Sequence, residues 1–211
     1  MTVRVKICGI TTEAGMDAAV AAGADWVGLN FFPASPRFVS PARAAELAAR
    51  PGVPTLVGLF VKATDEEIAA VLAQVRLDVL QVYDDAARAA AIRARFARPV
   101  WRAVGVATAA DLPRAADGVD GFVIEAKAPP GATRPGGNAV TFDWSVLAGW
   151  QAPAPWLLAG GLGPENVAAA IRATGAAAVD VASGVEREKG IKDPALVAAF
   201  VQAARRAAIA A

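Results

Sequence analysis

The chain has 211 residues, 55% of them hydrophobic, which fits one domain with a sizeable core. Its 21 Lys and Arg residues nearly balance its 20 Asp and Glu residues, and without a basic run the chain is expected to bind neither nucleic acid nor a membrane. A single cysteine excludes an internal disulfide, and with no histidine in the chain a zinc site is also disfavoured. The single cysteine and the lack of a signal-like start favour a cytoplasmic location.

Short apolar runs rich in β-branched residues recur along the chain, each bounded by Gly, Pro or Asp. This pattern is typical of strands that are buried on both faces. In chain order, the predicted strands are residues 3–9, 26–32, 55–61, 79–83, 100–106, 121–125, 156–160 and 178–183.

Alanine-rich stretches with helix-start signals lie between these strands, and they predict helices at residues 42–49, 68–75, 167–173 and 195–208. About eight alternating units in a chain of this length predict a compact α/β fold, a (β/α)8 TIM barrel forming one domain over residues 1–211. An open doubly wound sheet is the alternative. No G-x-G-x-x-G pattern follows the first strand, so a dinucleotide site has no support.

Residues 145–163 carry no charge and are about long enough to span a bilayer. The stretch contains Pro153, Pro155 and several glycines, and its composition changes midway. A short helix, a loop and a buried strand are therefore the better prediction.

The single cysteine, Cys8, lies at the end of the first predicted strand, just before Gly9. A lone cysteine is often a small buried hydrophobe. In a (β/α)8 barrel, however, active sites form where the strands end, and a turn at Gly9 leaves Cys8 near the mouth. Lys6 shares its strand face, so we expect its ammonium to lower the pKa of the thiol from about 8.5 toward neutrality, giving a thiolate without a histidine.

Further polar side chains lie at or near the ends of other strands. Glu125 ends "GFVIE" and is either a solvated loop carboxylate or a site acid whose pKa is raised by apolar surroundings. Because its strand and that of Cys8 lie on roughly opposite sides of the ring, the two side chains are expected to form an acid and base pair across a pocket. Gln81, Tyr83 and Asp180 are supporting candidates or polar filling of the upper barrel.

Two glycine-rich turns, "LLAGGLGPENV" and "VASGVE", follow the last two predicted strands. Loops at these places hold phosphate in barrels of this kind, which favours an anion site over two unrelated tight turns. Its expected backbone donors are Gly160, Gly161, Ser183 and Gly184. Arg37, in the long second loop "FFPASPRFVS", is either a surface charge or a clamp for a substrate carboxylate.

With these residues assembled, the chain resembles the phosphoribosylanthranilate isomerase family of tryptophan biosynthesis along its whole length. The matching segments are "VKICGIT", "GLNFFPASPRFVS", "VGLFV", "LQVYD", "RPGGNAVTFDW", "LAGGLGPENV" and "DVASGVEREKGIKD". The resemblance implies a single-domain (β/α)8 barrel that needs no cofactor or metal. It also implies a small phosphorylated substrate, and the protein is expected to be a monomer or a homodimer.

The implied reaction is the Amadori rearrangement of N-(5′-phosphoribosyl)anthranilate to 1-(2-carboxyphenylamino)-1-deoxyribulose 5-phosphate, the third step of tryptophan synthesis from chorismate. By this resemblance Cys8 is the general base, and Glu125 is the general acid at a position where the family has aspartate. Arg37 would hold the anthranilate carboxylate. The implied phosphate donors are Gly160, Gly161, Ser183 and Gly184, and the loop that would cover the site contains Gly136 and Gly137.

Besides Glu125, the chain departs from the family pattern at two places. The fourth strand ends in Val82-Tyr83-Asp84 where Leu-His-Gly is usual, and Ala139 stands where the covering loop commonly has glycine. These departures keep open a phosphate-binding barrel with weakened or no catalysis. A ribulose-phosphate epimerase is disfavoured because that family uses histidine and metal, and a dual-substrate isomerase would be expected to have aspartate where Cys8 stands.

Overall fold

The computed structural model describes residues 2–129, 131 and 143–207. Eight parallel strands close into a barrel in chain order, with the last paired to the first, which confirms the predicted (β/α)8 fold. All eight predicted strands are present in this part of the chain. They are β1 Arg4–Cys8, β2 Trp26–Asn30, β3 Thr55–Val61, β4 Val79–Tyr83, β5 Val100–Val106, β6 Gly121–Ala126, β7 Trp156–Leu158 and β8 Ala178–Val181.

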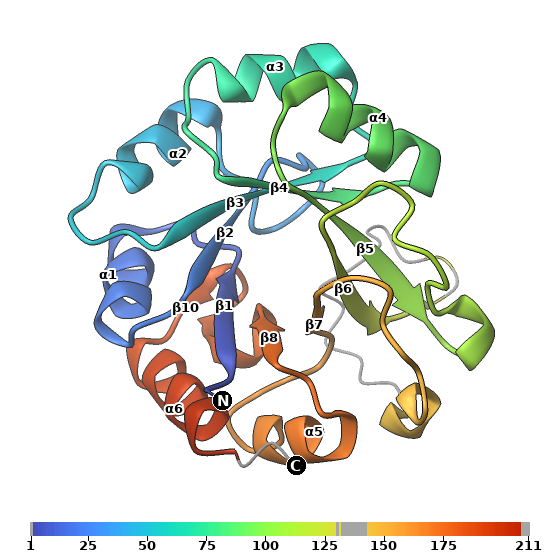
Figure 1. Ribbon diagram of the computed structural model, residues 1–211. Coiled ribbons are helices and arrows are strands. Elements are labelled where there is room, and N and C mark those ends of the chain that lie inside the picture. The colour runs from blue at the N-terminus through green and yellow to red at the C-terminus, as the bar shows by residue number, and fades with distance from the viewer. Residues whose placement is uncertain (1, 130, 132–142, 208–211) are drawn as a thin grey trace.

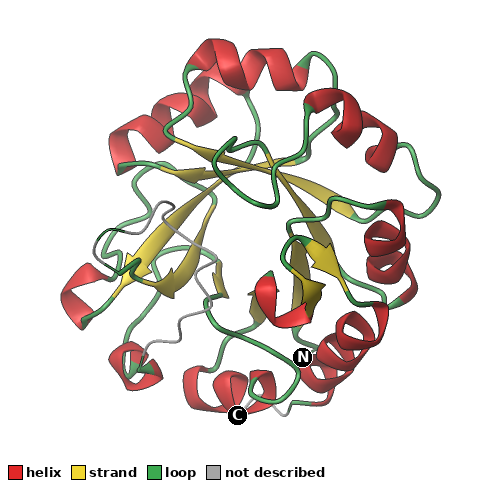
Figure 2. Cartoon of the chain, turned by 180° about the vertical axis from the view of Figure 1, so that it is seen from behind, coloured by secondary structure: helices red, strands yellow, loops and turns green. Residues whose placement is uncertain are grey.

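The helices form a ring outside the strands (Figures 1 and 2). After β5 and β6, the described residues contain only the short 3-10 turns η1 Ala109–Asp111 and η2 Trp144–Leu147. The α-helices are α1 Glu13–Ala21, α2 Pro41–Ala48, α3 Asp65–Leu72, α4 Ala86–Phe96, α5 Val167–Thr174 and α6 Pro194–Arg206.

Helix α3 begins three residues earlier than the predicted helix 68–75. Thr64 caps it: its side chain accepts from the Glu67 backbone N–H, while the Glu67 carboxylate accepts from the Thr64 N–H. This capping box satisfies backbone donors that the first helical turn leaves unpaired. Helix starts therefore follow the cap residue rather than the first apolar position.

Two apolar layers hold the barrel together. One fills the space between the strands and the helices, and the other fills the barrel itself. Within the inner layer, Trp26 and Trp101 meet edge to face with ring centroids 5.3 Å apart. Their bulk fills the N-terminal part of the barrel interior, so the polar inward-facing residues lie nearer the C-terminal ends of the strands.

The uncharged stretch 145–163 forms part of η2, a loop and then β7, as the sequence predicts. In the described part of the chain, no helix is long and apolar enough to cross a membrane.

After β8 the chain forms the 3-10 turn η3 Ser183–Val185 and then a small antiparallel hairpin. The hairpin consists of β9 Glu186–Glu188 and β10 Ile191–Lys192. It lies outside the barrel sheet and leads directly into α6.

Candidate active site

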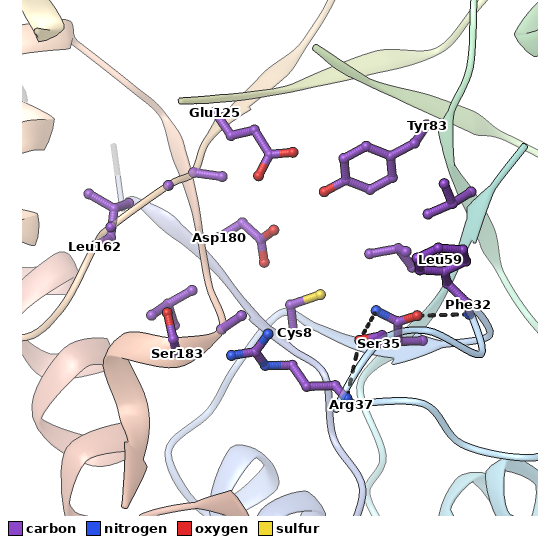
Figure 3. A pocket seen from close by; sticks show the side chains of 17 residues that line it. Cys8, Phe32, Ser35, Arg37, Leu59, Tyr83, Glu125, Leu162, Asp180 and Ser183 are labelled. Carbon is purple, nitrogen blue, oxygen red and sulfur yellow. Dashed lines mark hydrogen bonds between the residues drawn. The ribbon is translucent and has the colours of Figure 1, made fainter. Parts of the chain in front are cut away.

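A pocket of about 680 Å³, open to solvent, lies at the C-terminal end of the barrel (Figure 3). Strand ends and the loops that follow them supply its walls. Its lining residues are Cys8, Asn30, Phe32, Ser35, Arg37, Leu59, Val61, Tyr83, Glu125, Ala159, Gly160, Gly161, Leu162, Asp180, Val181, Ala182 and Ser183.

Cys8 ends β1 and is 5% exposed, with its thiol at the pocket. Gly28 is its register partner on β2. A Cβ atom on Gly28 would lie 2.7 Å from the Cys8 Sγ atom, so only glycine leaves room for the thiol in this position. The neighbouring strand thus determines where the sulfur lies.

Lys6 is fully buried below Cys8, and its Nζ atom lies 3.0 Å from the Asp180 carboxylate on β8. Burial acts to lower the pKa of Lys6, but Asp180 and then Cys8 raise it, and the net shift is upward. Lys6 is therefore a permanent cation in the barrel interior, paired with Asp180.

The expectation that Lys6 lowers the pKa of Cys8 toward neutrality is wrong. Burial raises the pKa of the thiol; Lys6 and Lys192 act against this effect, Asp180 adds to it, and the net shift is upward. Lys6 acts in the predicted direction, but desolvation and the carboxylate of Asp180 outweigh it.

Glu125 lies on β6 across the pocket from Cys8, and its side chain is 5% exposed. The hydroxyl of Tyr83, at the end of β4, points toward the Glu125 carboxylate (Figure 3). Burial raises the pKa of Tyr83 well above its ordinary value, and Glu125 raises it further by its charge and by a hydrogen bond. Tyr83 is thus a neutral hydroxyl donor beside Glu125.

Gln81, two residues before Tyr83, is fully buried and does not line the pocket. Among the described residues, neither atom of its side-chain amide has a hydrogen-bond partner. Such a group is rare in protein interiors and costly unless water or a ligand reaches it.

Arg37 reaches the pocket from the loop between β2 and α2 and is 4% exposed. The Ser35 hydroxyl accepts from the Arg37 backbone N–H at 3.1 Å and also from the side-chain amide of Asn30 at 3.1 Å. The Arg37 side chain lies across Gly9, where a Cβ atom would overlap with its Cδ atom. The loop and the end of β1 together fix the path of this side chain.

Arg37 does not enter the pocket as a free cation. Its Nε and Nη2 atoms donate to the two carboxylate oxygens of Glu186 at 2.6 and 2.9 Å. No hydrogen bond within the described part of the chain uses its Nη1 atom. The sequence does not identify Glu186 as a site residue, because its partner Arg37 is 149 residues away, although Glu186 ends the candidate segment "VASGVE".

The two glycine-rich loops meet beside this arginine. Gly160 and Gly161 have φ values of +87° and +63°, which L-residues with side chains rarely adopt. A Cβ atom on Gly184 would overlap with the backbone carbonyl of Leu162, so the loop after β8 packs directly against the loop after β7. Gly184 itself does not line the pocket, whereas Ser183 does.

Asn166 fixes the loop after β7. Its side chain accepts from the Gly163 N–H at 2.8 Å and donates to the Gly161 carbonyl at 2.9 Å. Gly136, Gly137 and Ala139 of the predicted covering loop lie outside the described residues. Among those that are described, no group of three or more His, Cys, Asp or Glu side chains is arranged to hold a metal ion.

Comparison with known proteins gives the family. The chain matches the family model described as N-(5′-phosphoribosyl)anthranilate (PRA) isomerase over residues 5–203. It is 58% identical over 204 residues to the N-(5′-phosphoribosyl)anthranilate isomerase of Acidiphilium cryptum, covering 97% of this chain and 99% of that protein. The isomerase of Rhodospirillum rubrum is 55% identical over 211 residues, covering 95% of this chain and 97% of its own.

Solved structures agree. The phosphoribosyl anthranilate isomerase of Thermotoga maritima is 35% identical with a TM-score of 0.82, covering 96% of this chain and 98% of its own. A second structure of such an isomerase, with a TM-score of 0.80 at 35% identity and the same coverage, contains reduced 1-(o-carboxyphenylamino)-1-deoxyribulose 5-phosphate. These relatives support an isomerase and not a barrel without catalysis. The chain belongs to the N-(5′-phosphoribosyl)anthranilate isomerase family and is an isomerase with a TIM-barrel fold.

Proposed function

We propose that this chain catalyses the Amadori rearrangement of N-(5′-phosphoribosyl)anthranilate in tryptophan biosynthesis, with Cys8 as general base and Glu125 as general acid. The observation that carries the assignment is the placement of a buried thiol and a buried carboxyl on different walls of one pocket. Both stand at the C-terminal ends of barrel strands, where (β/α)8 enzymes have their active sites.

In the first step, Glu125 protonates the furanose ring oxygen. The bond between this oxygen and C1′ breaks, and the lone pair of the anthranilate nitrogen forms the Schiff base. The Cys8 thiolate then removes the proton from C2′, and the electron pair moves toward the iminium nitrogen to give an enolamine. Tautomerisation places a proton on C1′ and a carbonyl at C2′, so C1′ is reduced and C2′ is oxidised without any external oxidant.

The raised pKa of Cys8 suits this chemistry. Abstraction of a C–H proton requires a strong base, and a thiol with a raised pKa gives a more basic thiolate once it is ionised. Lys6 and Lys192 both act to stabilise the thiolate, and both are buried. The cost is a small thiolate fraction at neutral pH.

The substrate carries two anions, and the proposal assigns a different part of the site to each. Arg37 would bind the anthranilate carboxylate through its planar guanidinium. Backbone N–H groups of Gly160, Gly161 and Ser183, which line the pocket, and of the adjacent Gly184 would bind the phosphate, as loops after the last two barrel strands do. On the opposite side of Arg37 from Ser183, Phe32 and Leu59 line the pocket (Figure 3), as does Val61, and these apolar side chains would contact the aromatic ring.

The test is turnover of the fluorescent substrate by purified protein, followed as loss of substrate fluorescence and by chromatography of the product. We expect conversion with no added metal or cofactor, unaffected by a chelator. A protein that binds the reduced product tightly but converts no substrate would contradict the proposal.

We also propose that the chain works in the cytoplasm as a monomer or homodimer. A single cysteine, which cannot form an internal disulfide, supports the location. One structure of the Thermotoga maritima relative is described as monomers generated from a dimeric enzyme. Light scattering on the eluting protein distinguishes the two states, and a larger assembly would overturn this part.

A further inference from the structure

The hairpin after η3 turns two charged side chains inward. Glu186 on β9 and Lys192 on β10 are register partners, and their side chains are 5% and 1% exposed. Of the five residues between them, Arg187, Glu188 and Lys189 are exposed. Burying two charges is expensive, and a packed apolar pair is often at least as stable. Stability alone therefore does not explain this arrangement.

The two side chains form one cluster with Arg37. Both oxygens of Glu186 accept from the Arg37 guanidinium at 2.6 and 2.9 Å, and Lys192 donates to Glu186 Oε1 at 2.9 Å. Such a two-point contact fixes the plane of the guanidinium as well as its position. Arg37 is therefore oriented by a partner from the other end of the chain.

With Arg37 and Lys192 both protonated, the cluster has one positive charge in excess of its single carboxylate. Burial lowers the pKa of Lys192 and outweighs Glu186, which raises it. Burial acts to raise the pKa of Glu186, but Arg37 and Lys192 outweigh it and the net shift is downward, so Glu186 is ionised at neutral pH. Arg37 is the member of the cluster that lines the pocket. The excess charge is thus available there to an anion.

The same cluster reaches the phosphate loop. Lys192 donates to the backbone carbonyl of Ala182 at 2.8 Å, and Ala182 directly precedes Ser183 and Gly184. One ammonium therefore contacts both the carboxylate that orients Arg37 and the backbone that leads into the second anion subsite. Movement of the hairpin would displace both subsites together.

We propose that Glu186 and Lys192 are positioning residues that lock Arg37 and couple its carboxylate subsite to the phosphate loop, so that the site selects ligands with two anions at a fixed spacing. This inference rests on the proposed function, because it takes Arg37 as the carboxylate ligand. Neither residue touches the reacting atoms. The role proposed for both is in binding and selectivity, since a clamp misplaced by about 1 Å loses much of its value; Lys192 in addition acts by its charge on the Cys8 thiolate.

The experiment compares two ligands that differ only in the carboxylate. One is reduced 1-(2-carboxyphenylamino)-1-deoxyribulose 5-phosphate, called the reduced product above. The other is its phenylamino analogue, which lacks the carboxylate. Dissociation constants are measured by calorimetry for the wild type, Glu186→Gln and Lys192→Gln. Glu188→Gln and Lys189→Gln are matched controls, because they change the same residue types on the same hairpin where the side chains are exposed.

We expect Glu186→Gln to weaken binding of the carboxylate ligand about tenfold or more and that of the analogue less than about threefold. Lys192→Gln should weaken both ligands and also inorganic phosphate, because it releases the Ala182 carbonyl as well. The controls should bind like the wild type. Equal weakening of both ligands by Glu186→Gln, or no weakening, would overturn the proposal.

Two further variants keep the result interpretable. If Glu186→Gln alone does not fold, the double variant Glu186→Gln/Lys192→Gln is tested in its place, because it returns the cluster to one net positive charge. Its affinity for the carboxylate ligand is still expected to fall about tenfold.

Arg37→Lys separates the positioning role from the proposed function. If it abolishes the preference for the carboxylate and the Glu186 variants do not, only the positioning role fails. If it leaves the preference intact, the proposed function of Arg37 fails.

Discussion

The two walls of the pocket differ in how they hold their titratable groups. On the β1 and β8 wall, Cys8 stands above the Lys6–Asp180 ion pair, with the buried Lys192 nearby. On the β4 and β6 wall, Glu125 faces the neutral hydroxyl of Tyr83, which packs on the apolar layer inside the barrel. The protonation of the base therefore depends on burial together with the charges of Lys6, Asp180 and Lys192, whereas the acid lies beside a neutral hydrogen-bond donor.

This difference has a physical reason. A thiol becomes a useful base only as an anion, which must be stabilised in a buried place, and cations provide that stabilisation. A general acid releases a proton and then carries a negative charge. A neutral hydrogen-bond donor such as the Tyr83 hydroxyl can stabilise that charge without adding a charge of its own. We therefore expect substitutions on the first wall to act through ionisation and those on the second through geometry.

Replacing the base should have the largest effect. Cys8→Ser places a hydroxyl, which is hardly ionised, where the thiolate stood, and kcat/KM should fall about 10³-fold, within the range of general acid and base catalysis. Fluorescence turnover gives the rate, and binding of the reduced product serves as the control for an intact site. A serine variant within tenfold of the wild type would refute the role of Cys8.

Changes at the acid come next. Glu125→Gln removes the transferable proton and should lower kcat about 10²-fold. Glu125→Asp keeps the proton but withdraws the carboxyl by about 1 Å from the ring oxygen and from Tyr83, so an intermediate loss of about tenfold is expected. The two variants are assayed side by side. If Glu125→Asp increases the rate, the longer glutamate side chain of the wild type places the acid less well for catalysis than aspartate would.

Lys6→Met tests the charges on the first wall. The wild-type rate should rise with pH beyond the ordinary pKa of a thiol, because the thiolate is the active form and its pKa is raised. Without the Lys6 cation this rise should move to still higher pH, and the rate at pH 7 should fall about tenfold, as for a pKa shift of about one unit. Iodoacetamide alkylation of Cys8 as a function of pH gives the same information independently of turnover.

The Lys6 variant also needs a stability control. It leaves the Asp180 carboxylate buried and unpaired, and the free energy of unfolding should fall by about 3–5 kcal/mol. Lys6→Met/Asp180→Asn removes both charges and should regain part of this loss in urea unfolding. An alkylation profile unchanged in the single variant would show that Lys6 does not influence the thiol.

The smallest effect is expected for Tyr83→Phe, which deletes one hydroxyl and retains the ring against the inner apolar layer. Loss of one hydrogen bond of about 1 kcal/mol corresponds to a roughly fivefold lower kcat. The pH dependence attributed to Cys8 should stay unchanged, which separates this wall from the other. A shift of that profile would show that the two walls are coupled.

Much of the fold is encoded locally and could be predicted. Runs such as 55–61 and 79–83 become strands with the predicted bounds because their apolar side chains are buried on both faces. Because strand ends converge at the barrel mouth, the sequence also predicts four site candidates that all line the pocket: Cys8, Tyr83, Glu125 and Asp180.

What could not be predicted depends on contacts between distant segments. The sequence shows that Lys6 is two residues from Cys8. It does not show that the Lys6 ammonium donates a hydrogen bond to Asp180, which is 174 residues away. The upward shift of the Cys8 pKa follows from burial and from the nearby Asp180 carboxylate. Glu186 likewise has no local signature, because it resembles the exposed Glu188 two residues later until Arg37 is placed against it.

The bare α-carbon of Gly9 has a practical consequence for inhibitor design. Cys8, the proposed base, directly precedes Gly9, and the side chain of Arg37 lies against Gly9. The thiol and the proposed carboxylate clamp therefore line the pocket on either side of this glycine. A benzoate whose ring carries a mild electrophile could use the arginine as its anchor and present the reactive carbon to the sulfur. Selectivity over other cellular thiols would then come from the anchor, and the high thiol pKa would favour labelling in alkaline buffer.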